Sequence, residues 1–266
     1  MKKLKDKVAI ITGASKGIGE GIARVFARYG AKLVLVARGE EVLELARDLT
    51  EQGYTAFGVR TDVSDQKSVD AMVQAAVDTY GTIDILVNNA GICVLEDFDA
   101  PDYAVRDRHI DINIKGVWNV THAVLPHMIE KKDGRIVVMS SVTGYMVADP
   151  GEAAYAMTKA ALIGFTRAMA REVADHNIRV NAICPGYVRT PLVEGMAKQS
   201  DPENPERAIQ AIADAVPLKR LAHPEEVGEL AAFLASDESS YITGTQIVID
   251  GGSTLPETPS LGQEPS

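Results

Sequence analysis

The segment VAIITGASKGIG, residues 8–19, joins a short apolar run to a loop that contains three glycines. Apolar residues then recur at the spacing of one helix face, at Ile18, Ile22, Val25, Phe26 and Tyr29. Glycines between a strand and a helix let the backbone turn tightly and approach a pyrophosphate held at the positive helix N-terminus. The segment therefore predicts a strand, a phosphate-binding loop and a helix, with an ordinary glycine turn as the alternative.

The same alternation of strand and helix continues along the chain. Gly30 ends the first helix, and residues 32–36 (KLVLV) have the pattern of a buried strand. Helical stretches separate five further apolar runs, at residues 55–59, 83–91, 134–141, 178–186 and 245–250. Seven such strands predict an α/β fold: a single doubly wound Rossmann domain, residues 1–255, whose mainly parallel sheet is covered by helices on both faces.

Two segments depart from this alternation. Residues 187–223 are polar and carry Pro202 and Pro205, and we expect a helical substrate-binding insertion that acts as a lid. Residues 256–266 (PETPSLGQEPS) are rich in proline and polar side chains, which predicts a flexible C-terminal tail.

The composition excludes several classes of partner. The formal net charge is -10, so neither nucleic acid nor an anionic membrane surface is an expected partner. No apolar run approaches the roughly 20 residues of a membrane-spanning helix, and no signal-peptide pattern opens the chain. Cys93 and Cys184 are the only cysteines, and neither they nor the five histidines have metal-ligand spacing. We expect a cytoplasmic protein without a metal site.

The end of the second strand predicts which dinucleotide is bound. An acidic residue at this position suits a free ribose 2'-hydroxyl, whereas arginine suits a 2'-phosphate. Here the expected acidic position is Ala37, Arg38 follows it, and Lys16 adds a second cation in the glycine loop. These residues favour NADP(H), with NAD(H) still usable, unless both side chains are merely solvated charges.

Tyr155 and Lys159 lie four residues apart in the sequence YAMTK, on one face of a predicted helix. A tyrosine hydroxyl with its usual pKa of about 10 is a poor base, but a neighbouring ammonium lowers that pKa. The pair can therefore relay a proton. An ordinary amphipathic helix is the alternative, because this spacing alone is common.

Several short motifs occur in a familiar order: TGASKGIG at residues 12–19, NNAG at 88–91, INIKG at 112–116, SSVTG at 140–144, YAMTK at 155–159 and PGYVRTP at 185–191. In order and spacing they resemble the short-chain dehydrogenase/reductase family over almost the whole chain. The resemblance implies an enzyme that transfers a hydride between a nicotinamide and a carbonyl or alcohol carbon of a small molecule.

The same resemblance assigns catalytic roles. Tyr155 would be the general acid/base, Lys159 would lower its pKa and hydrogen-bond the nicotinamide ribose, Ser141 would hold the substrate oxygen, and Asn113 would anchor a water that completes a proton relay. The loop before Tyr155 is one residue longer than is usual in the family. Ser140 is therefore the alternative to Ser141.

The resemblance also implies a larger set of cofactor contacts, which includes the two relay residues: Gly13, Ser15, Lys16, Gly17, Ile18, Gly19, Arg38, Asp62, Val63, Asn89, Ala90, Gly91, Tyr155, Lys159, Pro185, Gly186, Val188 and Thr190. Two of these have structural alternatives. Asp62 could cap the following helix, and the NNAG motif could be only a strand terminus.

The expected substrate contacts are Ser141, Tyr145, Tyr155 and Tyr187, in a pocket with mostly apolar walls. Family members suggest a homotetramer, with long helices near residues 102–129 and 155–173 forming the interfaces. The alternative to an enzyme is a non-catalytic NADP(H)-sensing protein with the same fold, which would need no proton relay.

Overall fold

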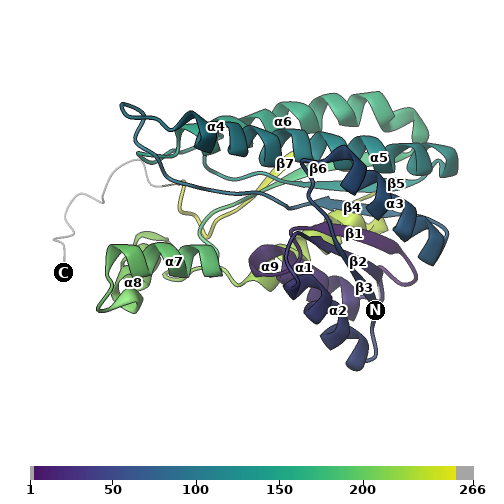
Figure 1. Ribbon diagram of the computed structural model, residues 1–266, viewed down its shortest axis with the longest axis horizontal. Helices are drawn as coiled ribbons and strands as arrows, with labels where there is room; N and C mark the ends of the chain where they lie inside the picture. The colour runs from purple at the N-terminus through teal and green to yellow at the C-terminus, as the bar shows by residue number, and fades with distance from the viewer. Residues whose placement is uncertain (1–2, 256–266) are drawn as a thin grey trace.

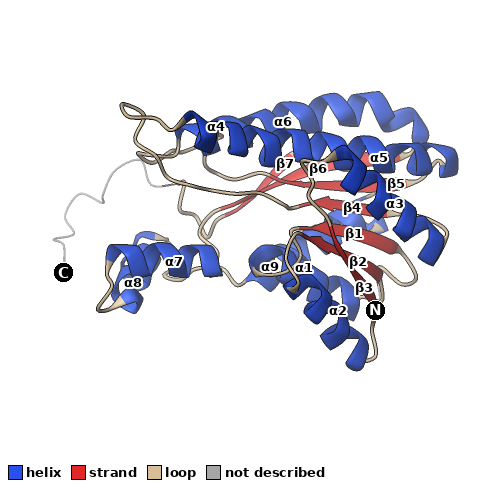
Figure 2. Cartoon of the chain, in the orientation of Figure 1, coloured by secondary structure: helices blue, strands red, loops and turns tan. Residues whose placement is uncertain are grey.

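The seven apolar runs form the strands of one parallel sheet (Figures 1 and 2). The computed structural model describes residues 3–255, so the predicted tail at 256–266 lies outside the described residues. The strands are β1 (Val8–Thr12), β2 (Lys32–Ala37), β3 (Thr55–Arg60), β4 (Ile85–Asn88), β5 (Gly134–Met139), β6 (Ile178–Pro185) and β7 (Gln246–Ile249). The predicted doubly wound fold is confirmed.

The strand order is β3-β2-β1-β4-β5-β6-β7. The chain builds outward from β1 to β3 and then returns to place β4 on the other side of β1. In doubly wound sheets ligands bind where the order reverses, beyond the carboxyl ends of the strands. That crevice lies here between the loops that follow β1 and β4.

Helices cover both faces of the sheet (Figure 2). One face carries α1 (Gly17–Arg28), α2 (Glu41–Glu51) and α9 (Pro224–Ala235), and the other carries α3 (Gln66–Tyr80), α5 (Gly116–Lys131) and α6 (Ala153–Val173). α1 and α9 touch closely because Gly21 has no side chain: a Cβ there would lie 2.5 Å from the backbone of Pro224. Buried aliphatic side chains fill both layers between helices and sheet.

The helical region before β5 is not one regular helix. α4 (Tyr103–His109) runs into a π-helical turn, Ile110–Lys115, and then into α5. Asn113 lies within this turn. π-helical turns widen the backbone and occur frequently at functional sites.

The segment at 187–223 contains two helices, α7 (Pro191–Ser200) and α8 (Pro205–Ala215), set apart from the sheet layers in Figure 1. Short 3₁₀ turns, Ala174–His176 and Asp237–Ser239, flank other elements. Within residues 3–255, no helix is both long and apolar enough to cross a bilayer.

Candidate active site

The glycine loop after β1 lies at the reversal point of the sheet. Gly13 has a φ of +65°, which favours glycine, and a Cβ there would lie 2.8 Å from the backbone of Ala90. A Cβ on Gly19 would collide with the carbonyl oxygen of Gly13. Gly13 and Gly19 therefore allow the loop, the start of α1 and the end of β4 to approach closely.

Asn89 fastens this loop to β4. Its amide nitrogen donates to the carbonyl oxygens of Thr12 and Gly13, at 3.0 and 3.1 Å. In return, the hydroxyl of Thr12 accepts the backbone N–H groups of Asn89 and Ala90, both at 3.0 Å. The NNAG motif therefore does more than end a strand, and Thr12 is a supporting residue that the sequence did not single out.

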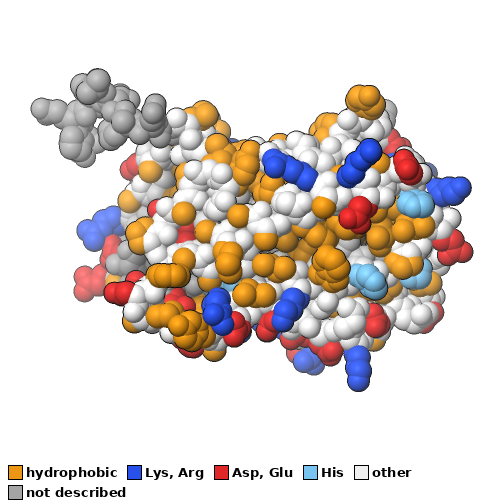
Figure 3. All heavy atoms as spheres, turned by 90° about the horizontal axis from the view of Figure 1, so that it is seen from above, with side chains coloured by type: hydrophobic (Ala, Val, Ile, Leu, Met, Phe, Trp, Pro, Cys, Tyr) orange, Lys and Arg blue, Asp and Glu red, His pale blue; other side chains and the backbone are white. Residues whose placement is uncertain are grey.

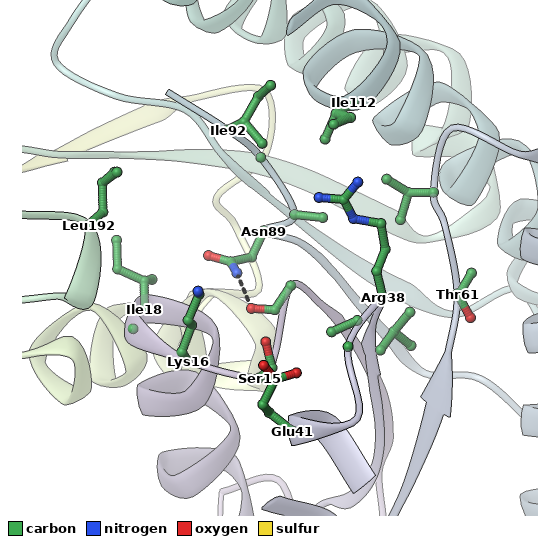
Figure 4. A pocket seen from close by; sticks show the side chains of 18 of the residues that line it. Ser15, Lys16, Ile18, Arg38, Glu41, Thr61, Asn89, Ile92, Ile112 and Leu192 are labelled. Carbon is green, nitrogen blue, oxygen red and sulfur yellow. Dashed lines mark hydrogen bonds between the residues drawn. The ribbon is translucent and has the colours of Figure 1, made fainter. Parts of the chain in front are cut away.

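A cavity of about 410 Å³ opens beside the loop (Figure 4). The ends of β1, β2, β3 and β4 and the start of α7 contribute to its wall. Twelve of the predicted cofactor residues line it: Gly13, Ser15, Lys16, Gly17, Ile18, Arg38, Asp62, Val63, Asn89, Ala90, Gly91 and Thr190. Ile112, the first residue of the INIKG motif, also lines it, as do Glu41 and Thr61, which no motif marked.

The cavity carries two exposed cations, Lys16 and Arg38. Figure 4 shows the Arg38 side chain reaching into the cavity from the end of β2, with Lys16 rising from the glycine loop. Neither side chain has an ion-pair partner in the described part of the chain. Asp62 accepts hydrogen bonds from the backbone and side chain of Ser64, and these bonds, together with the charge of Arg38, hold the pKa of its carboxyl below the usual range.

A second cavity, of about 180 Å³, adjoins the first and contains the predicted catalytic residues. Ile18, Asn89 and Gly91 line both cavities, so the two form one continuous cleft. The second cavity is also lined by Ser140, Ser141, Tyr155, Lys159, Pro185, Gly186, Val188 and Thr190 from the predicted set, and by Cys93, Leu192 and Val193. Residues distant in sequence thus meet beyond the carboxyl ends of β4, β5 and β6.

Lys159 is only 5% exposed, and its Nζ lies 5.6 Å from the centre of the Tyr155 ring. The ammonium donates to the carbonyl oxygen of Met139 at 2.8 Å. Burial lowers the pKa of Lys159 to about 8. Burial also raises the pKa of Tyr155, while a hydrogen bond with Ser141 opposes that rise. Desolvation therefore dominates the pKa of Tyr155, and the lowering expected from Lys159 is not seen in this arrangement.

The two serines of the SSVTG motif face different partners. Ser140 donates its hydroxyl to the carbonyl oxygen of Lys159 at 2.8 Å inside the protein. Ser141 lines the cavity together with Tyr155, and its hydroxyl counteracts the rise in the pKa of the tyrosine. Its Oγ also accepts the backbone N–H of Thr143 at 3.1 Å. Of the two serines, only Ser141 acts on Tyr155 in this way.

Asn113 is fully buried behind this cavity. Its Oδ1 accepts the N–H of Ile92 at 2.9 Å, and its Nδ2 donates to the Ile92 carbonyl oxygen and to the Thr158 hydroxyl, both at 3.0 Å. The side chain therefore ties the loop after β4 to α6. These partners use both N–H groups of the amide and one lone pair of its oxygen, so the side chain is held in one orientation.

Two expected substrate residues differ in placement. Tyr187 lies between the lining residues Gly186 and Val188, and its hydroxyl donates to Asp149 at 3.5 Å. The hydroxyl of Tyr145 accepts from Gln246 on β7 at 2.7 Å, and Tyr145 does not line the cleft. Among the described residues, no group of three or more histidine, cysteine, aspartate or glutamate side chains is arranged to hold a metal ion.

Comparison with known proteins shows which family this chain resembles. A family model described as "Enoyl-(Acyl carrier protein) reductase" matches residues 13–254. The chain is 63% identical over 262 residues, 98% of its length and 100% of the relative's, to oxidoreductase UcpA of Salmonella typhimurium. It is 41% identical to the 3-oxoacyl-[acyl-carrier-protein] reductase FabG of Thermotoga maritima, covering 94% of this chain and 98% of that one.

Solved structures of reductases are also similar to this chain. L-sorbose reductase from Gluconobacter frateurii, complexed with NADPH and L-sorbose, superposes with a TM-score of 0.92 at 35% identity, covering 96% of this chain and 100% of that one. Levodione reductase gives 0.89 at 36% identity, with 94% and 98% covered. The chain therefore belongs to the short-chain dehydrogenase/reductase family of NAD(P)-dependent oxidoreductases.

Proposed function

We propose that the protein transfers a hydride between NADP(H) and an uncharged carbonyl compound or secondary alcohol, through Ser141, Tyr155, Lys159 and Asn113. The observation that carries this proposal is the continuous cleft. One part presents a glycine loop and two cations, and the adjoining part presents a serine, a tyrosine and a buried lysine.

The residues of the cleft fit a dinucleotide. Gly13 packs so closely against Ala90 that any side chain there would clash. The glycine loop beside it lines the cavity, and α1 directs its positive N-terminus toward this loop. The nicotinamide group, when bound, supplies or accepts the hydride. Pro185, Gly186, Val188 and Thr190 would hold its carboxamide end.

Proton transfer falls to Tyr155. During reduction, negative charge grows on the substrate oxygen, and a preorganised donor at that position stabilises it. Tyr155 would donate its proton there while Ser141 holds the same oxygen. During oxidation, the phenolate would take the proton back.

Lys159 would supply the positive charge that makes this exchange reversible. With a pKa of about 8 it remains mostly an ammonium at neutral pH, and it is one helical turn from Tyr155. Its bond to the Met139 carbonyl oxygen holds it in the cleft, where it would bind a ribose hydroxyl of the dinucleotide. The backbone carbonyl of Asn113, in the π-helical turn, would hold the water that links Lys159 to solvent.

Lys16 and Arg38 support a preference for NADPH over NADH. Two cations without ion-pair partners, in the described residues, line the same cavity, and Arg38 follows β2, where a ribose 2'-phosphate would lie. Arginine binds phosphate through parallel hydrogen bonds, and this geometry adds specificity as well as affinity.

The substrate end of the cleft favours uncharged molecules. Leu192 and Val193 offer apolar contact in the cavity wall. Tyr187 lies next to that wall, and burial, followed by the nearby carboxylates of Asp149 and Glu152, raises its pKa. An anionic tail would meet this negative charge. Expectations of a homotetramer and of a cytoplasmic location belong to the same proposal.

The alternative is a sensor that binds NADP(H) without turnover, and kinetics separate the two. NADPH oxidation would be followed with matched ketones that bear neutral, ammonium or carboxylate tails, and NADP⁺ reduction with the matching alcohols. Turnover of neutral members supports the proposed function. Binding of NADPH without any turnover would favour the sensor.

A further inference from the structure

His109, the last residue of α4, is fully buried and has no role in the proposed chemistry. Its ring meets the ring of Tyr155 edge-on, with centroids 6.5 Å apart and an interplanar angle of 66°. The same imidazole contacts the loop of residues 92–101, which follows β4 and provides Ile92 and Cys93 to the catalytic cavity.

Both ring nitrogens of His109 have backbone partners. The N–H of Val94 donates to Nε2 at 3.2 Å, and Nδ1 lies 2.9 Å from the carbonyl oxygen of Val105. A carbonyl oxygen only accepts, so Nδ1 must carry the hydrogen; an amide N–H only donates, so Nε2 must be free of one. The two bonds are therefore compatible only with the neutral imidazole.

The loop depends on few such ties. Asn113 binds Ile92, His109 binds Val94, and the N–H of Glu96 donates to the carbonyl oxygen of Gly151 in the loop before α6. Cys93 lies between the first two ties, so its place in the cavity wall is fixed from both sides.

We propose that His109 is a positioning residue for the catalytic cavity: its neutral imidazole fastens the loop of residues 92–101 beside Tyr155, and its protonation releases that loop. The proposal depends on the proposed function only where it calls the cavity catalytic; the contacts of His109 with the loop do not depend on it. Protonation at Nε2 would make the ring N–H face the backbone N–H of Val94. This removes the hydrogen bond to Val94 and leaves a buried donor without an acceptor.

The charged and titratable groups around His109 come from three elements. Tyr155 faces it from α6, and Cys93 lies next to Val94 in the loop. Glu152, at the start of α6, acts on both of these groups. On α4 itself, Arg106 and Arg108 are exposed. None of these forms an ion pair with His109 in the described residues, so a proton on the ring would find no acceptor in the present arrangement.

Amide hydrogen exchange of the peptide covering residues 92–101, in the cofactor-free protein, tests the proposal without any turnover. Protection, corrected for the intrinsic exchange rate at each pH, should fall as the pH is lowered from neutral, because a proton on the ring removes the acceptor of the Val94 N–H. Because the fastened state excludes the proton, the fall can reach about tenfold per pH unit. A failure of the proposed enzymatic function leaves this measurement unaffected.

Two variants sharpen the test. In His109→Gln the amide oxygen can accept the Val94 N–H but does not titrate, so protection should become independent of pH. In His109→Phe a ring still packs on Tyr155, but Val94 loses its acceptor and protection should be low at every pH. The matched control, His176→Gln, changes a histidine at the opposite end of β6 and should follow the unaltered protein.

Activity gives a second measurement. The kcat/KM of the unaltered protein should decline in the same acid range as loop protection, and His109→Gln should remove that shared decline. Constant loop protection across this range in the unaltered protein, or an unchanged acid decline in His109→Gln, would overturn the proposal, and the first result needs no variant to fold.

Discussion

At the scale of single residues, Lys159 carries a cost in stability that its proposed role explains. Burial lowers its pKa to about 8 from the usual 10.5, so the folded state binds this proton less tightly than the unfolded state. The free energy of unfolding should therefore rise as pH increases from about 8 toward 10.5, because the unfolded chain still holds the proton there. A fully buried group in this position costs on the order of 3 kcal/mol at neutral pH.

Lys159→Met tests this cost. The substitution removes the buried charge but also the hydrogen bond to the Met139 carbonyl oxygen, worth about 1 kcal/mol. We expect the cofactor-free variant to be more stable at pH 7 by about 1–2 kcal/mol, to lose the rise between pH 8 and 10.5, and to be almost inactive. Denaturant unfolding at several pH values measures both effects; equal or lower stability of the variant would contradict the desolvation argument.

Alanine substitutions of Ser140 and Ser141 should affect stability and turnover differently. Ser141→Ala removes the hydroxyl that acts on Tyr155, and we expect kcat to fall by about 10²-fold or more. Ser140→Ala removes a buried bond to the Lys159 carbonyl oxygen and should cost about 1 kcal/mol of stability with a smaller effect on kcat. Kinetics and thermal unfolding of both variants distinguish these roles, and near-normal turnover of Ser141→Ala would reverse the assignment.

At the scale of elements, the end of β2 and the glycine loop should set the preference between the two dinucleotides. Arg38→Ala removes a charge-assisted contact worth about 1.5–3 kcal/mol, so the ratio of kcat/KM for NADPH to that for NADH should fall by about 10- to 100-fold. Lys16→Ala should lower the same ratio by a smaller factor.

Arg47→Ala is the matched control, since this exposed arginine on α2 does not line the cleft. It should leave the ratio unchanged. A ratio unaffected by Arg38→Ala, or one that favours NADH in the unaltered protein, would contradict the assignment.

Some elements of the site could be predicted from the sequence alone, and others could not. Local patterns could be predicted from the sequence, because all of their residues lie close together along the chain. They are the glycine loop, the spacing of Tyr155 and Lys159, and the alternation of strands and helices. The contacts of Asn113, Thr12 and His109 depend on a π-helical turn and on loops brought together from distant positions. Sequence spacing does not show which distant loops come into contact. For the same reason, the sequence placed Tyr145 in the substrate pocket, whereas its hydroxyl contacts Gln246 on β7.

At the scale of the whole molecule, the outer face of α5 and α6 carries large apolar side chains. Trp118 is 61% exposed and Met157 is 49% exposed, and Figure 3 shows apolar side chains spread over this upper face. Aromatic residues and methionine are enriched at protein–protein interfaces. These exposed side chains support the expectation that two copies pair through these helices within a homotetramer.

Light scattering measures the assembly directly. We expect a mass near four times the 28.5 kDa of one chain, and Trp118→Asp should lower it by placing a charge in the interface. Gln74→Asp, on the exposed side of α3, should not change the mass. A stable monomer in the unaltered protein would refute the homotetramer.

The proton transfer from Tyr155 is the step on which the proposed function depends. The comparison to make is NADPH binding and turnover of neutral carbonyl compounds by the unaltered protein and by Tyr155→Phe, which keeps the ring against His109 and removes only the hydroxyl. The expected result is turnover by the unaltered protein, with a kcat/KM for the variant lower by about 10²- to 10⁴-fold at a similar Kd for NADPH. Equal turnover by both proteins, or binding without turnover by either, would contradict it.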